Sequence, residues 1–97
     1  MKVLFLNEAR DDMMWFRRYY RLTFPAGKLN AFRHMETTLH LLKVNPLLGT
    51  ELGHKGRRKL PVPRTPFLLI YQLAAGNIEI VRVWDGRQEP STGFQEE

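Results

Sequence analysis

The spacing of apolar residues changes once along this chain, at Asn45-Pro46, and that change constrains the fold more than any other feature. Before it, apolar residues recur every three or four positions, which is typical of one face of a helix. The first such stripe comprises Ala9, Met13, Phe16 and Tyr20, and the second comprises Leu29, Phe32, Met35, Leu39 and Leu42. The sequence therefore predicts two helices, one over about residues 8–22 and one ending before Pro46, which cannot continue a helix.

Shorter β-prone runs surround the two helical segments. Lys2–Leu6 precedes them, and three runs follow them at 58–63, 67–73 and 78–84. Ala75-Gly76-Asn77 supplies the turn of a hairpin between the last two runs. The predicted order is βααβββ in one domain spanning 1–97, which is an ordinary domain size. An irregular tail is predicted from about residue 88. The predicted class is α+β, a helical hairpin packed on a mostly antiparallel four-stranded sheet.

Alternation along the last strands predicts which side chains face the helices. Phe67, Leu69, Tyr71 and Leu73 are expected to face them, which leaves Leu68 and Ile70 on the opposite surface. In the last strand, Val81 and Val83 are expected opposite Ile80, Arg82 and Trp84. Two layers cannot cover the far face, so we expect a partner, a second copy or the tail to cover it. Pro61 and Pro63 predict a poorly paired strand edge.

Composition narrows the class of protein. The net charge of +5 suits either solubility or a polyanionic partner, whether nucleic acid or an acidic protein, and His54–Arg64 holds five cations without an acid. Cysteine is absent, which excludes disulfides, thiolate metal sites and cysteine nucleophiles. The longest apolar run, Phe67–Tyr71, is too short to span a membrane. We therefore expect a soluble cytoplasmic protein with no membrane partner.

Few residues suggest catalysis. His34, His40 and His54 are spaced so that they would not converge on a metal ion, and no phosphate-binding glycine motif occurs. Glu8, Asp11 and Asp12 lie in the first turn of a predicted helix, where capping and dipole effects account for them. Asp85 follows the last strand and is interpreted as a turn aspartate. No cofactor and no metal site are predicted.

Aromatic and basic residues are the remaining candidates for binding. Helical spacing favours a core position for the aromatic side chains Trp15, Phe16, Tyr19, Tyr20 and Phe24, with Tyr19 or Tyr20 partly exposed. Four arginines lie on or beside the last three strands: Arg58, Arg64, Arg82 and Arg87. Arginines on a sheet can bind phosphate or receive an acidic helix.

Several segments in this order resemble the RelE/ParE superfamily. They are Glu8-Ala9 at the start of the first helix, Pro46-Leu47-Leu48-Gly49 after the second, and the strand segments 57–63, 64–71 and 78–90. The resemblance implies a toxin of a bacterial toxin–antitoxin pair. RelE-like members cut mRNA on the ribosome, and ParE-like members inhibit DNA gyrase.

The chain departs from the nuclease pattern at three positions. Leu68 stands where a nuclease carries arginine, Asp85 replaces the histidine of the closing motif, and Phe94 stands where a tyrosine is needed. RNA cleavage requires stabilisation of phosphate charge and a proton donor, so these changes favour the ParE-like branch. The alternative is a ribosome-dependent mRNA endonuclease that uses Arg58, Arg82, Arg87 and Asp85. A third possibility is a target-inactive relative that retains only antitoxin binding.

The resemblance also implies binding sites. The partners are a ParD-like antitoxin, in a hetero-oligomer, and DNA gyrase, and no residue is expected to be catalytic. We expect the antitoxin to contact Trp15, Tyr19, Arg58, Leu68, Ile70, Val81 and Arg82. We expect the target to contact Arg64, Arg82, Trp84 and Arg87.

Overall fold

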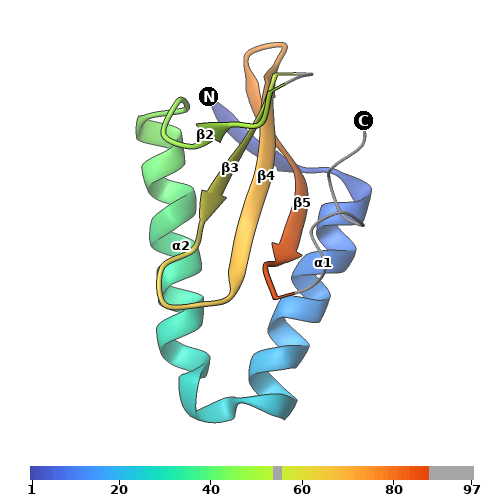
Figure 1. Ribbon diagram of the computed structural model, residues 1–97, viewed down its shortest axis with the longest axis vertical. Helices are drawn as coiled ribbons and strands as arrows, with labels where there is room; N and C mark the ends of the chain where they lie inside the picture. The colour runs from blue at the N-terminus through green and yellow to red at the C-terminus, as the bar shows by residue number, and fades with distance from the viewer. Residues whose placement is uncertain (54–55, 88–97) are drawn as a thin grey trace.

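The computed structural model describes residues 1–53 and 56–87, which form two helices and a five-stranded sheet (Figure 1). The elements in order are β1 (Lys2–Phe5), α1 (Asn7–Arg18), α2 (Lys28–Val44), β2 (Thr50–Glu51), β3 (Arg57–Pro61), β4 (Phe67–Ala74) and β5 (Asn77–Asp85). A π-helical turn, Tyr19–Thr23, and a 3₁₀ turn, Pro25–Gly27, join the two helices. The predicted α+β class is confirmed. The tail from residue 88 lies outside the described residues.

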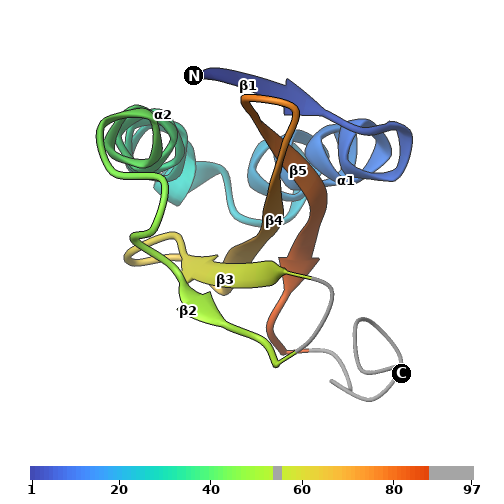
Figure 2. The ribbon, with the colours of Figure 1, turned by 90° about the horizontal axis from the view of Figure 1, so that it is seen from above.

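The sheet has the strand order β1-β5-β4-β3-β2. β1 runs parallel to β5, and the other neighbouring pairs are antiparallel. The sheet has one strand more than predicted, because β2 pairs with β3 through only two residues, too few to produce an alternating pattern. Figure 2 shows how far the strand directions turn between β1 and β2. Beyond the β2 pairing, β3 has no outer neighbour at Pro61, in agreement with the predicted poorly paired edge.

α1 and α2 meet at the two short turns and spread apart toward the other end of the molecule (Figure 1). Both contribute to one core with the sheet, which contains Ala9, Phe16 and Tyr20 from the first helical segment and Ala31, Met35 and Leu42 from α2. Edge-to-face packing of Phe16 on Phe67, at 5.0 Å between ring centroids, joins the hairpin to β4. The aromatic residues do not all belong to this core: Trp15 and Phe24 are exposed, so the core prediction was wrong for both.

A β-bulge interrupts β5. Ile70 pairs with Arg82 and the next residue of β4, Tyr71, pairs with Ile80, so Val81 has no partner in the register. Because of the extra residue, Ile80 and Val83 both belong to the core, and the predicted placement of Val83 opposite Ile80 was wrong.

The far face, opposite the helices, carries Leu68 and Ile70 of β4 beside Trp84 and Arg82 of β5. This face was expected to leave Ile70 uncovered, but Ile70 is 0% exposed and Trp84 is 7% exposed. Lys59 and Arg82 flank Ile70 on the neighbouring strands, where their aliphatic stems can shield it. The expectation of an open apolar face was therefore wrong at Ile70.

No helix in the described ranges 1–53 and 56–87 is both long enough and apolar enough to cross a membrane.

Candidate functional site

Arg82 is bound within the chain by a carboxylate from α1. Its Nε lies 2.7 Å from Asp12 Oδ2 and its Nη2 lies 3.1 Å from Asp12 Oδ1, and the guanidinium also stacks on Trp84 at 5.0 Å. Asp12 Oδ2 also accepts the backbone N–H of Val83 at 2.8 Å. Capping and dipole effects therefore do not account for Asp12, contrary to the expectation from sequence. Hydrogen bonding to Asp12 raises the pKa of Arg82.

Arg87 is bound in the same way at the end of β5. Its Nη2 and Nε donate to the two oxygens of Asp85 at 2.7 and 2.9 Å, and its Nη1 donates to Tyr19 Oη at 2.9 Å. Asp85 is 8% exposed and also accepts the backbone N–H of Arg87, as expected of a turn aspartate. The hydrogen bonds from Arg87 lower the pKa of Asp85 although burial raises it. Asp85 is therefore an ionised acceptor at neutral pH, a poor proton donor.

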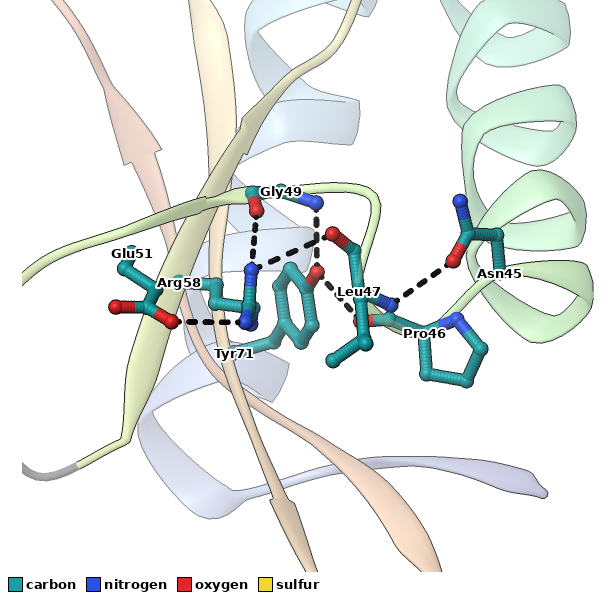
Figure 3. A network of polar contacts seen from close by, with 7 residues as sticks. All are labelled: Asn45, Pro46, Leu47, Gly49, Glu51, Arg58 and Tyr71. Carbon is teal, nitrogen blue, oxygen red and sulfur yellow. Dashed lines mark hydrogen bonds and ion pairs between the residues drawn. The ribbon is translucent and has the colours of Figure 1, made fainter.

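Arg58 belongs to a polar network between β3, β4 and the loop after α2 (Figure 3). Its Nη1 donates to the carbonyls of Leu47 and Gly49, at 3.3 and 2.8 Å, and its Nη2 lies 3.1 Å from Glu51 Oε2. The pairing of Arg58 with Tyr71 puts it on the helix side of the sheet, whereas Arg82 pairs with the far-face residue Ile70. The nuclease candidates Arg58 and Arg82 therefore lie on opposite faces.

Tyr71 is the buried member of that network. Its hydroxyl donates to the Pro46 carbonyl and accepts the Gly49 N–H, both at 2.8 Å (Figure 3). A side chain at Gly49 would lie 2.7 Å from the Lys59 carbonyl and within 2.9 Å of Tyr71, so the loop approaches β3 and β4 as closely as a glycine allows. The segment Pro46–Gly49, identified in the sequence as a motif, thus has a structural role: it holds the loop after α2 against β3 and β4.

The remaining predicted target contact, Arg64, lies in the turn between β3 and β4 with a φ of 61°. It is exposed and forms no ion pair with the residues described. Of the four predicted arginines, only Arg64 lacks an acidic partner in that part of the chain. Leu68 and Val81, predicted antitoxin contacts, are half-buried, and Trp15 is exposed on α1.

An apolar groove of about 280 Å³ lies between α1 and α2. Its walls are Met13, Phe16 and Arg17 from α1 and Phe32, Met35, Glu36 and Leu39 from α2. Its apolar members all belong to the two predicted helical stripes, which did not indicate a groove. The groove lies between the helices because they spread apart from the turns that join them (Figure 1). The apolar periodicity does not indicate how far they spread.

The histidines and acids of the described residues do not form a metal-binding arrangement. No group of three histidine, aspartate or glutamate side chains among them is close enough to hold a metal ion. His34 and His40 lie on α2, and His54 is outside the described residues. Two residues that organise the site, Asp12 and Tyr71, were not predicted to do so, because their partners are 70 and 25 positions away in the sequence.

Comparison with known proteins gives matches of two kinds, to a family model and to solved structures. A family model described as the ParE toxin of type II toxin–antitoxin system, parDE, matches residues 3–90. A solved structure described as the chromosomal ParDE TA system from P. aeruginosa is similar with a TM-score of 0.68. It is 23% identical, over 86% of this chain and 92% of that chain, so this likeness shows the fold alone. No curated protein matches the sequence.

Proposed function

The chain belongs to the ParE toxin family of type II toxin–antitoxin systems, and from that premise we propose that it inhibits DNA gyrase and is neutralised by a ParD-like antitoxin. It would act without a catalytic residue, by binding, in the cytoplasm where gyrase works. Free and antitoxin-bound forms would alternate, the bound form being a hetero-oligomer.

The observation that carries this proposal is the internal pairing of the arginines that a nuclease would need. Arg82 and Arg87 each form a two-point pair with an aspartate of the same chain. The charge of a guanidinium held in this way is balanced by a carboxylate of the same protein, so the guanidinium is a poor ligand for a scissile phosphate. The lowered pKa of Asp85 also deprives the closing motif of an acid.

We place the antitoxin in the groove between α1 and α2. The groove is lined by apolar side chains from both helices and bordered by the oppositely charged Arg17 and Glu36. An amphipathic helix can insert its apolar side chains into such a groove and pair charges at the rim. A further antitoxin segment would contact Trp15 and Arg82, which line a second hollow of about 250 Å³ between α1 and β5.

Purified protein tests the proposal in two parallel assays. It should block supercoiling by gyrase, and adding the cognate antitoxin should restore the reaction. The same preparation should leave mRNA intact in a translating extract. Codon-positioned mRNA cuts without any effect on gyrase would instead establish the endonuclease alternative.

Inactivity in both assays, with retained antitoxin binding, would identify a target-inactive member of the family.

A further inference from the structure

The inner part of the helical hairpin, residues 13–35, has a net charge equal to that of the whole chain. Residues 13–35 contain no aspartate or glutamate and hold five cations: Arg17, Arg18, Arg21, Lys28 and Arg33. The other residues carry ten cations and ten acids, so they are neutral in sum and the +5 comes from this segment. Such a segregation of charge produces a local positive potential rather than a uniform one.

These cations form no ion pair with any residue that the structure describes. The ion pairs among residues 1–53 and 56–87 are Arg58–Glu51, Arg82–Asp12 and Arg87–Asp85, and none of them involves the segment 13–35. Arg18, Arg21 and Arg33 are exposed. Arg58, Arg82 and Arg87 are thus paired with acids of the chain, whereas the cations of segment 13–35 have no such pair among the described residues.

Large apolar side chains accompany the cations at the tip of the hairpin, which we define as residues 18–33. Leu22 and Leu29 are each 71% exposed, and Phe24 is 50% exposed. Figure 1 shows the joining turns at one end of the molecule, beyond the ends of the strands. A protruding surface that combines exposed leucines with unpaired arginines is typical of an interaction site rather than of a solvated helix end.

The tip has a defined shape. The backbone N–H of Phe24 donates to the Tyr19 carbonyl at 3.0 Å, and that of Gly27 donates to the Phe24 carbonyl at 3.1 Å. The ring of Phe24 lies so close to Gly27 that a Cβ there would be 2.6 Å from Cε2. Side chains held on such a fixed turn lose less entropy when they bind.

We infer that the hairpin tip is the surface that binds the protein target. The target would contribute an acidic patch that also offers apolar contacts. This inference rests on the proposed function, in which that target is gyrase. DNA would engage the arginines but leave the two exposed leucines unexplained. A membrane surface would call for a broad, continuous apolar helix face, and the tip offers three separate apolar side chains.

The test compares two variants that lose the same charge. One carries Arg18→Gln, Arg21→Gln and Arg33→Gln in the tip, and the control carries Lys2→Gln, Arg10→Gln and Lys43→Gln, exposed cations outside 13–35. Association with immobilised purified gyrase, free of DNA, is measured at two salt concentrations. The tip variant should associate about tenfold more slowly with a weaker salt dependence, and the control should stay within about twofold of wild type.

A second variant, Leu22→Ser with Leu29→Ser, tests the apolar part and should dissociate from gyrase faster than wild type. All variants should bind the cognate antitoxin like wild type, which also shows that they are folded. Equal effects of the tip and control variants, or unchanged gyrase binding by the tip and leucine variants, would overturn the inference. Loss of binding to duplex DNA or anionic vesicles, with gyrase binding unchanged, would overturn it too.

If the wild-type protein itself does not bind gyrase, both the proposed function and the assignment of the tip are wrong. This outcome is distinguishable from failure of the tip assignment alone, in which the wild type binds gyrase and the tip and leucine variants bind it equally well.

Discussion

Asp12 of α1 accepts hydrogen bonds from both the side chain of Arg82 and the backbone of the next residue, Val83. This contact lies just beyond the point where β1 ends, since the last pair of that ladder is Phe5 with Ile80. A helix carboxylate therefore replaces a strand as the neighbour of β5. Charged side chains at open strand edges also discourage pairing with another chain.

Replacing Asp12 with Asn should destabilise the fold by about 1–3 kcal/mol, because a partly buried guanidinium loses its counter-charge and one oxygen acceptor becomes a donor. Urea denaturation measures this free energy. The neighbouring exposed Asp11→Asn is the matched control and should change stability by no more than about 0.5 kcal/mol. Equal stability of the two variants would show that the pair contributes nothing.

Tyr71→Phe removes a hydroxyl that both donates and accepts a hydrogen bond in a buried position. The Pro46 carbonyl and the Gly49 N–H would be left without it, so we expect a loss of about 1–3 kcal/mol in denaturation experiments. Thr50→Ala, an exposed change in the adjoining strand, should be nearly neutral. A neutral Tyr71→Phe would mean that the loop does not depend on the hydroxyl.

Asp85 predicts a pH dependence of stability. Its pKa is lowered in the folded protein, so its ionised form contributes stability above the unfolded pKa, close to 3.8, and that contribution is lost as pH falls through the lower folded value. Asp85→Asn should therefore flatten the fall in stability below about pH 4. Urea midpoints at pH 6, 4 and 3 test it, with Asp11→Asn as the control. An unaltered slope would contradict the Arg87 contact.

Leu39→Glu tests the groove as the antitoxin site. A charge among the apolar groove residues should weaken antitoxin binding by about 2 kcal/mol or more, roughly thirtyfold, in calorimetric titration. Leu41→Glu, on the same helix but outside the groove, should bind like wild type. If Leu41→Glu weakens binding more than Leu39→Glu, the antitoxin occupies another face of α2.

Local patterns predicted the elements well because their signals lie within a few residues. The stripes of Phe16 and Met35, and the break at Asn45-Pro46, indicated helices that the structure contains. β2 was not predicted because its two residues, which pair with β3, are too few to show an alternating pattern. The faces of Ile80 and Val83 in β5 were mispredicted because simple alternation cannot include an unpaired Val81.

Side-chain partnerships were much harder to predict than elements. The arginines of the last strands were identified as important, but their aspartate partners were assigned to capping or to a turn. Asp12 meets Arg82 only after the chain has folded, and no local spacing indicates that contact. The exposure of Trp15 and Phe24 was likewise not indicated by apolar periodicity.

The bulge at Val81 has a consequence for comparing this chain with its relatives. A relative with one residue fewer between Ile80 and Val83 would keep uninterrupted alternation, and the residue aligned with Arg82 by simple counting would then point into the core. Such a relative could keep the contact with the α1 carboxylate only through the single residue that stands between its equivalents of Ile80 and Val83. Alignments within the family should therefore place an indel at Val81, so that this residue is aligned with Arg82.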